Sequence, residues 1–377
     1  NIYIICSEKV NWMTLEKFKA AAAQIEPVYH DKEGTINKTC KWIERAGSED
    51  VDLVVFPEAH IPGFPYWCAG APRWGELMVE LKKNSLRDGD DALEVIGEAV
   101  AEANLYAVIG GNELDTRPGS DTVYNVLYYF NRDGEVIGKH RKLKPTLHER
   151  TVWGEGDPSS LQVYQTDLGN LGGLICYENH MTLSKAALCG MGEEIHVATW
   201  PGFWELDPNT MMFDRAEDRS ALEACDAYPA MRQYAFETQS FVVSSHAYIS
   251  EDLMAEYEND FIYDFGAGGS MLIGPSGILK EGPVVGEEEL VTATYHRDER
   301  RAAKAMFDAM GHYTRWDAVN LNISRSTYEP ISTNGTESPS PLVGNSAQET
   351  DEKIDEIAAE YEIDRDAVAE IAQTLSD

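Results

Sequence analysis

The chain has 377 residues, enough for one large domain or two ordinary domains with a substantial core. Its 65 Asp and Glu residues outnumber its 31 Lys and Arg residues, and the formal net charge of −34 at pH 7 argues against nucleic-acid binding by phosphate neutralisation. Because acidic clusters recur along the whole chain, at 88–91, 193–194, 251–252 and 287–289, we interpret them as the solvated coat of a salt-adapted (halophilic) cytoplasmic protein rather than as a local interaction surface.

The first part of the chain alternates apolar strands with helices. Segments 18–25 and 51–57 read as buried strands, and a helix is expected between them at about 34–47. A second helix is expected at about 90–104, followed by a strand that begins at Tyr106. Residues 123–141 are typical of a β-hairpin, because Asp133-Gly134 supplies the turn between two apolar runs.

The second part repeats this alternation. The strands predicted here lie near 161–164, 171–176, 195–199, 241–248, 269–273 and 290–295. The predicted helices lie near 182–191, 219–239 and 297–308. Interleaved strands and helices predict a layered α/β domain.

We expect four regions along the chain. Residues 1–17 form an N-terminal extension, and 18–325 form the α/β domain. Residues 326–350, rich in Ser, Thr, Asn, Gly and Pro toward their end, read as a flexible linker. Residues 351–377 recover helical spacing but are too short for a stable domain, so they are expected to dock on the body or on a neighbouring subunit.

The cysteines and the apolar stretches limit the cellular setting. The six cysteines contain no Cys-x-x-Cys pair and do not predict a disulfide framework. No stretch approaches the length of a transmembrane span, and the apolar residues Ile2 to Cys6 are too few for a signal-peptide core. We therefore expect a reduced, soluble protein that does not interact with membranes.

Cys176 is the most informative residue. It ends the apolar run Leu171–Ile175 and precedes a polar turn. A cysteine on an apolar strand is usually only a small buried hydrophobic residue. At the strand end, however, we expect it to be half exposed, with backbone N–H groups of the following turn available to a developing anion.

Two further strand ends offer partners for this thiol. Glu58 follows the apolar run 51–57; such a carboxylate is usually solvated, but burial beside a thiol would raise its pKa and make it a general base. Lys142 and Lys144 alternate on an extended segment and are expected to face the same side, where a cation would favour a thiolate. His140, His148 and His180 lack metal-ligand spacing, so we predict no metal and no cofactor. The alternative for Lys142 and Lys144 is that both are ordinary surface charges.

These residues lie in motifs that occur in the same order in a known family. The motifs are Phe-Pro-Glu-Ala at 56–59, His-Arg-Lys-Leu-Lys-Pro-Thr-Leu-His-Glu-Arg-Thr-Val-Trp-Gly-Glu-Gly-Asp at 140–157, and Gly-Gly-Leu-Ile-Cys-Tyr-Glu-Asn-His-Met at 172–181. Weaker matches lie at 198–201, 268–277 and 311–315. From about residue 18 to 325 the sequence resembles the nitrilase superfamily of carbon–nitrogen hydrolases, and within it the nitrilase branch.

This resemblance implies a four-layer αββα sandwich and a Glu-Lys-Cys triad. The triad maps by motif to Glu58, Lys142 and Cys176, and a further family glutamate maps to Glu149. Lys144 is then a bystander. Two positions depart from the family pattern: Tyr177 stands where tryptophan is common, and Trp316 where proline is common. The backbone N–H of Tyr177 remains, so the oxyanion site is expected to survive.

The implied activity is hydrolysis of an organic nitrile to the carboxylic acid and ammonia, through a thioimidate and a thioester on Cys176. An amidase and an amide-forming nitrile or cyanide hydratase are alternatives on the same scaffold, and a non-catalytic binding or scaffold protein is an alternative of another class. The only partner expected besides the small-molecule nitrile is the chain itself, as a homo-oligomer that is a dimer or a larger assembly such as a spiral.

The substrate pocket is expected to be partly aromatic, which favours an organic nitrile over free cyanide. Several aromatic residues lie close in sequence to the motifs, and about half of them are expected to serve packing. They are Tyr66, Trp67, Trp153, Trp200, Phe203 and Trp204.

Overall fold

The structure is a computed structural model that describes residues 14–68, 70–202, 226–262, 266–315 and 317–325. The chain divides into two units, 1–327 and 328–377, and the described residues all belong to the first unit. The predicted linker 326–350 and the predicted C-terminal helices 351–377 lie outside the described residues, as do Phe203, Trp204, Trp316 and residues 1–13 of the predicted N-terminal extension.

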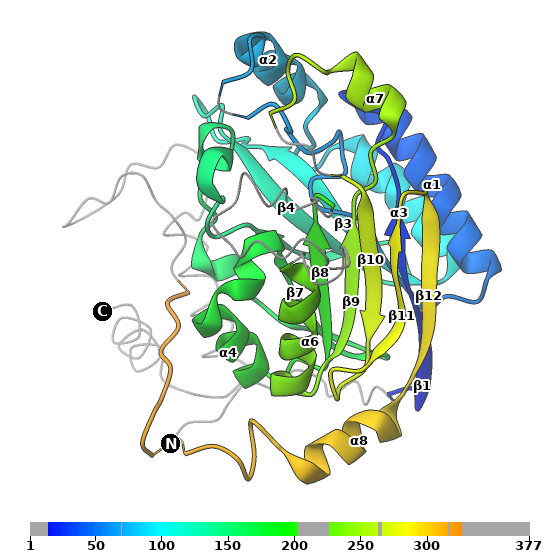
Figure 1. Ribbon diagram of the computed structural model, residues 1–377, viewed down its shortest axis with the longest axis vertical. Coiled ribbons are helices and arrows are strands. Elements are labelled where there is room, and N and C mark those ends of the chain that lie inside the picture. The colour runs from blue at the N-terminus through cyan, green and yellow to red at the C-terminus, as the bar shows by residue number, and fades with distance from the viewer. Residues whose placement is uncertain (1–13, 69, 203–225, 263–265, 316, 326–377) are drawn as a thin grey trace, which may run out of the picture. The chain divides into compact units, whose positions relative to one another are not determined.

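Two six-stranded sheets form the centre of the molecule (Figure 1). The first has the order β12-β1-β2-β3-β4-β5 and the second the order β11-β10-β9-β8-β7-β6. The first sheet is built from β1 (Lys17–Gln24), β2 (Leu53–Val55), β3 (Tyr106–Leu114), β4 (Val123–Phe130), β5 (Val136–Arg141) and β12 (Glu289–His296). The second is built from β6 (Tyr164–Thr166), β7 (Gly169–Ile175), β8 (Ile195–Trp200), β9 (Phe241–His246), β10 (Gly268–Ile273) and β11 (Leu279–Val285).

Alternation along the short strand β2 shows how the layers are held together. Leu53 and Val55 face the second sheet and share a core with Leu174 of β7, whereas Val54 faces the helices on the other side. All three β2 side chains are buried, because the strand is covered on both faces. A parallel strand in this position therefore reads as a continuous apolar run, as residues 53–55 do.

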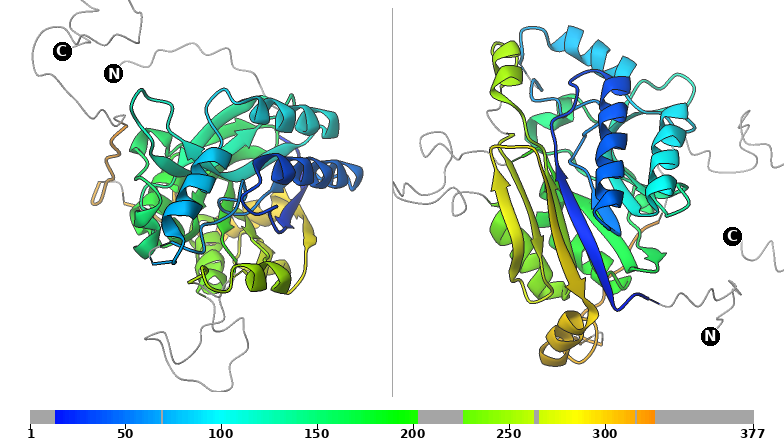
Figure 2. Two further views of the ribbon diagram at one scale, coloured as in Figure 1. Left: turned by 90° about the horizontal axis from the view of Figure 1, so that it is seen from above. Right: turned by 90° about the vertical axis from the view of Figure 1, so that its right-hand side faces the viewer.

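Helices cover the outer face of each sheet (Figures 1 and 2). On the first sheet, α1 (Lys32–Ser48) and α3 (Asp91–Ala103) pack side by side. On the second, α4 (Thr182–Gly190) and α6 (Ala227–Thr238) contribute Leu188 and Met231 to the hydrophobic cluster that includes the strands of this sheet. The order helix, sheet, sheet, helix confirms the predicted four-layer α/β sandwich.

Local sequence signals place the ends of the helices. Asp31 and Asp90 are the N-caps of α1 and α3, and their side chains accept hydrogen bonds from the N–H groups of Gly34 and Ala92. Asn104 ends α3 in the left-handed conformation. These caps explain why both helices lie within two residues of their predicted bounds.

Among the strands and α-helices of the described residues, three were absent from the sequence prediction. They are the edge strand β11 and the helices α2 (Trp74–Asn84) and α7 (Glu251–Glu256). β11 is only partly buried and contains Gly282-Pro283, a pair that normally indicates a turn. The helix predicted at 219–239 is observed as α6 from Ala227, and α8 (Arg297–Met306) agrees with its prediction. Within the described residues, no helix combines the length and hydrophobicity needed to cross a bilayer.

Acidic side chains are exposed at three of the four predicted clusters, and the prediction of a solvated cluster was wrong for Glu193. Asp88, Glu251 and Glu287 are exposed. Glu193, by contrast, is buried, where it accepts a hydrogen bond from the Tyr234 hydroxyl at 2.6 Å and lies 2.9 Å from His196 Nδ1. Glu193 therefore belongs to the interior, whereas its neighbour Glu194 is half-buried.

The net charge of −34 predicts that salt stabilises the fold. Raising NaCl from about 0.1 M to about 1 M shortens the Debye length from ~10 Å to ~3 Å, which weakens the repulsion among surface carboxylates. We expect the Tm measured by circular dichroism to rise over this range, and KCl at equal ionic strength to give the same rise. A Tm that is unchanged or lower in both salts would contradict this expectation.

Candidate active site

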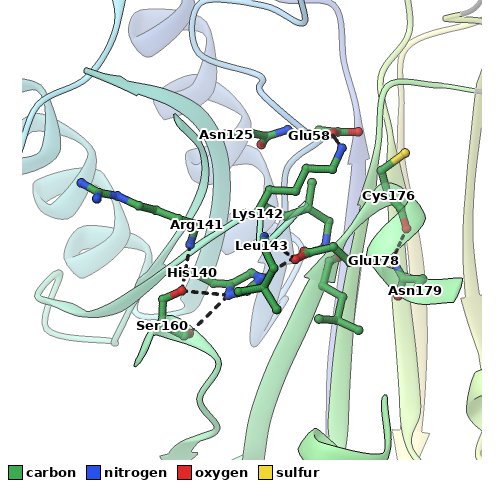
Figure 3. Close-up of polar contacts among 12 residues, drawn as sticks. Glu58, Asn125, His140, Arg141, Lys142, Leu143, Ser160, Cys176, Glu178 and Asn179 are labelled. Atoms are coloured by element: carbon green, nitrogen blue, oxygen red, sulfur yellow. Dashed lines mark hydrogen bonds and ion pairs between the residues drawn. The ribbon is translucent and has the colours of Figure 1, made fainter. Parts of the chain in front are cut away.

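Four polar side chains meet at the ends of strands from both sheets, and Figure 3 labels three of them, Glu58, Lys142 and Cys176. Glu58 lies three residues after β2, and Lys142 follows β5 directly. Cys176 follows β7 and begins the 3-10 helix η3 (Cys176–His180), while Glu149 lies in the 3-10 helix η1 (Leu147–Thr151). The sequence motifs that carry these residues are far apart in the chain, and the structure brings all four together.

Lys142 is the centre of this cluster. Its Nζ donates hydrogen bonds to Glu58 Oε1 and to Glu149 Oε2, both at 2.7 Å, and lies 5.5 Å from the centre of the Trp153 ring. Burial opposes the charge of the ammonium, but Glu149 and Glu58 outweigh it and hold the pKa of Lys142 well above its usual value. Lys142 is therefore a buried, permanently charged group.

Glu58 is buried and has an unequal pair of oxygens. Oε1 accepts hydrogen bonds from Lys142 and from Asn125 Nδ2 at 2.7 Å, whereas Oε2 accepts none within the described part of the chain. Burial raises the pKa of Glu58 to about 7, against the opposing effect of the Lys142 charge. A carboxylate with this pKa and one oxygen without a donor is suited to take up a proton near neutral pH.

Cys176 is 4% exposed, so the expectation of a half-exposed thiol was wrong. The residue adopts a φ of +51°, in the left-handed region that a non-glycine residue occupies only at a cost of about 1–3 kcal/mol. Its carbonyl accepts a hydrogen bond from Asn179 Nδ2 at 2.8 Å, which helps to hold this turn. Burial, and then the nearby Glu58, raise the pKa of the thiol well above its usual value, so it is neutral at rest.

Glu58, Glu149 and Cys176 also form a group that could in principle hold a metal ion, because their ligand atoms lie within 4.8 Å of one another. The Lys142 ammonium, however, is already bound by both carboxylates. It supplies to both carboxylates the positive charge that a cation would bring.

Lys144 does not share the environment of Lys142, contrary to the expectation that both face the same side. β5 ends at Arg141, and the chain turns immediately after Lys142. Lys144 is exposed and pairs with Glu155 on the surface. Its role as a bystander to the cluster is in keeping with this position.

The sequence analysis missed three residues that hold this site. Asn125 interrupts the apolar strand β4, which was the available signal, and it bonds Glu58. Glu178 and His140 form a buried pair with a separation of 3.0 Å between Oε2 and Nε2. Both lie in the motifs already recognised, but nothing in their spacing indicated that they would touch.

The aromatic residues predicted for the pocket have different surroundings. Trp153 packs against Lys142 and donates its indole N–H to Asn112 Oδ1. Tyr66 and Trp67 are fully buried; Tyr66 donates its hydroxyl to the carbonyl of Pro201, and Trp67 donates its indole N–H to His30 Nε2.

Trp200 and Tyr177 lie on the η3 side of the site. Trp200 is buried and stacks on His246, with 5.7 Å between ring centres. Tyr177 is half-buried and lies 6.5 Å from Trp200, also between ring centres.

Comparison with known proteins gives one consistent family. A model of the carbon–nitrogen hydrolase family matches residues 19–305. The chain is 32% identical over 341 residues to a nitrilase of Bacillus sp. (strain OxB-1), covering 89% of this chain and 93% of that protein. It is 33% identical over 326 residues to an aliphatic nitrilase of Rhodococcus rhodochrous, covering 84% and 85%.

Solved structures resemble the chain in fold. The nitrilase-superfamily protein Nit3 of Saccharomyces cerevisiae has a TM-score of 0.62 at 19% identity, covering 80% of this chain and 97% of that one. An amidase from Nesterenkonia sp. has a TM-score of 0.54 at 14% identity, covering 77% and 94%. At such low identity these structures bear on the architecture alone.

Proposed function

The chain belongs to the carbon–nitrogen hydrolase family and has the function of a nitrilase, and we propose that Glu58, Lys142 and Cys176 are its catalytic residues. The observation that carries this proposal is the buried Lys142 ammonium, bound by Glu58 and Glu149 beside the Cys176 thiol. The arrangement offers a nucleophile, a base of suitable pKa and a fixed cation in one place. The substrate is an organic nitrile and the products are a carboxylic acid and ammonia.

In the proposed first step, Glu58 takes the proton of the Cys176 thiol and the sulfur attacks the nitrile carbon. One C–N π bond breaks as the C–S bond forms, and the nitrogen takes the proton from Glu58 to give a thioimidate, which returns Glu58 to its carboxylate form. Lys142 and the backbone N–H of Tyr177 stabilise the negative charge that develops. Because the resting thiol is neutral and Glu58 has a pKa of about 7, proton transfer to this base is the step that activates the nucleophile.

In the later steps, Glu58 activates a water molecule that adds to the thioimidate carbon. Ammonia leaves, a thioester remains, and a second water releases the acid and restores the thiol. Glu149 positions Lys142: besides its bond to the ammonium, it accepts a hydrogen bond from the N–H of Thr146 at 2.6 Å, which fixes its carboxylate.

An amidase or an amide-forming hydratase would use the same four residues, so the products must distinguish these activities. The matching of nitrilases over more than four fifths of the chain favours the acid-forming reaction. A binding protein that has lost catalysis is disfavoured, because the nucleophile, base and cation are all present, with a Glu58 oxygen within 4.8 Å of the Cys176 sulfur and Lys142 bonded to Glu58. Trp153, beside Lys142, is the best supported of the proposed pocket residues. Tyr66, Trp67, Trp200 and Phe203 remain predictions.

Cys176→Ala is expected to abolish hydrolysis of every nitrile. The parent protein, supplied with an aromatic, an arylaliphatic and an aliphatic nitrile, should release acid and ammonia in equal amounts, as measured by chromatography and an ammonia assay. Cys189→Ala, which removes another buried thiol, should keep this activity. Activity retained in Cys176→Ala would disprove the mechanism, and amide as the main product would indicate a hydratase.

The pKa of Glu58 predicts an acid limb in the pH profile. Because the carboxylate form is the base, kcat/KM should fall as pH drops through about 7. Asn125→Ala removes a hydrogen bond to this carboxylate, so it should raise the pKa of Glu58 and move the limb to higher pH. A limb at the same pH in both proteins would show that Glu58 is not the group that titrates.

We also propose that the protein forms homo-oligomers. A groove of about 790 Å³ runs between α4 and residues 309–315 and 319–321, and its rim includes Leu183 and Tyr313, each 69% exposed. Exposed apolar surface of this kind is typical of a contact between copies. Leu183→Glu should lower the mass measured by light scattering, whereas Ile278→Glu, at an equally exposed site outside the groove, should not. Equal masses for the parent and both variants would contradict the proposal that copies of the chain meet at this groove.

A salt-adapted cytoplasmic setting is proposed from the charge alone. The net charge of −34 and the exposed clusters at Asp88, Glu251 and Glu287 support it. The salt dependence of Tm described for the fold is its first test.

A further inference from the structure

Glu178 has no part in the proposed chemistry, yet it lies buried between the two segments that carry Lys142 and Cys176 (Figure 3). Its Oε1 accepts a hydrogen bond from the N–H of Leu143 at 2.7 Å, and its Oε2 accepts one from the N–H of Ile175 at 2.9 Å. Leu143 directly follows the lysine, and Ile175 directly precedes the cysteine. One carboxylate therefore holds the backbone on both sides of the reaction site.

This bridge matters because Lys142 and Cys176 belong to different sheets. β5 is an edge strand of the first sheet and β7 lies in the second, so no ladder of backbone hydrogen bonds joins them. Apolar packing fixes the distance between the two sheets. It restricts the sliding of one sheet along the other less strictly than directed hydrogen bonds do. The two bonds of Glu178 supply directed contacts at the level where the lysine and the thiol must be aligned.

His140 contacts the same carboxylate. It lies on β5, two residues before Lys142, and its Nε2 is 3.0 Å from Glu178 Oε2, while its Nδ1 is 3.3 Å from the carbonyl oxygen of Ser160. Burial opposes both charges, but each partner outweighs it: the pKa of His140 is raised and that of Glu178 is lowered. Both shifts favour the charged forms of the pair, and an ionised carboxylate binds two amides more strongly than a neutral acid.

We propose that Glu178, through its two hydrogen bonds to backbone N–H groups, is a positioning residue that sets the alignment of Lys142 with Cys176 across the two sheets. The inference rests on the proposed function, because it concerns the geometry of that reaction. The sulfur must meet the nitrile carbon while the ammonium faces the charge that forms, and a displacement of about 1 Å can lower the rate by ~10²-fold. The competing explanation is that Glu178 and His140 are only a buried ion pair that stabilises the fold.

Glu178→Gln separates these explanations. The amide keeps the size of the side chain, but its nitrogen cannot accept a hydrogen bond, so only one of the two backbone N–H groups keeps its acceptor. We expect kcat per folded molecule to fall by about 10²-fold with KM within about threefold of the parent value, because alignment in the transition state is lost and binding is not. The folded fraction is measured by circular dichroism at the assay temperature.

His140→Gln is the matched variant. It breaks the same ion pair and should lower Tm to a similar extent, but the Glu178 carboxylate can still accept both amides. Its kcat should therefore stay within about tenfold of the parent value. Asp115→Asn is the control for a buried, ion-paired carboxylate elsewhere: Asp115 bonds Arg117 and Ser120 and contacts neither segment, so its kcat should match the parent. Equal losses of kcat in Glu178→Gln and His140→Gln, or an unchanged kcat in Glu178→Gln, would overturn the proposal.

A second measurement does not depend on nitriles. Alkylation of Cys176 by iodoacetamide, followed by peptide mass spectrometry, should be slower in Glu178→Gln, because the thiol stays buried but is less well aligned with Glu58. Faster labelling of Cys176 together with the buried Cys68 and Cys189 would show a loosened fold and would overturn the proposal. A parent protein that labels normally but hydrolyses no nitrile would contradict the proposed function and leave this alignment test intact.

Discussion

A lysine ammonium buried between two carboxylates is the constraint on which the rest of the site depends. Removing such charges from water is costly, and the cost is offset only when each partner is held at hydrogen-bond distance. Lys142 meets Glu58 and Glu149 at 2.7 Å each, and Asn125 and the N–H of Thr146 bind the carboxylates in turn. The end of β2, the beginning of β4 and the end of β5 must therefore lie at fixed positions relative to one another. The sandwich fixes these positions because both faces of the first sheet are covered.

The same burial sets the chemistry. Desolvation raises the pKa of the Cys176 thiol and that of Glu58, while it fails to neutralise Lys142 because two carboxylates oppose it. The result is a neutral nucleophile, a base poised near neutrality and a fixed cation. A more open site would leave the carboxylate fully ionised and the cation screened by water, and both would be weaker in the roles proposed for them. Excluding bulk water from the site is thus part of the function proposed for this fold.

The nucleophile is held from two directions. Cys176 has a φ of +51°, and Asn179 binds its carbonyl from one side of the turn, while Glu178 binds the preceding N–H from the other. Asn179 Oδ1 in turn lies 2.8 Å from Nε2 of the buried His196. Two neighbouring residues of η3 therefore tie the strained turn to the second sheet and, through Glu178, to the first. A turn with this backbone conformation persists only where surrounding contacts over-determine it.

The sequence by itself determined the layered α/β fold, the family and the four residues of the central cluster. Periodicity places strands and helices, and the order of the motifs around Glu58, Lys142 and Cys176 is specific. The tertiary structure alone decided that Cys176 and Glu193 are buried. It also decided that Lys142 is buried whereas Lys144 is exposed, and that Asn125 and Glu178 support the site. The reason is physical. Burial and buried hydrogen bonds depend on which distant segments meet: Asn125 and Glu58 are 67 residues apart, and Glu178 and Leu143 are 35 apart. Local patterns report which face of an element is apolar, but not which polar group lies opposite a given side chain.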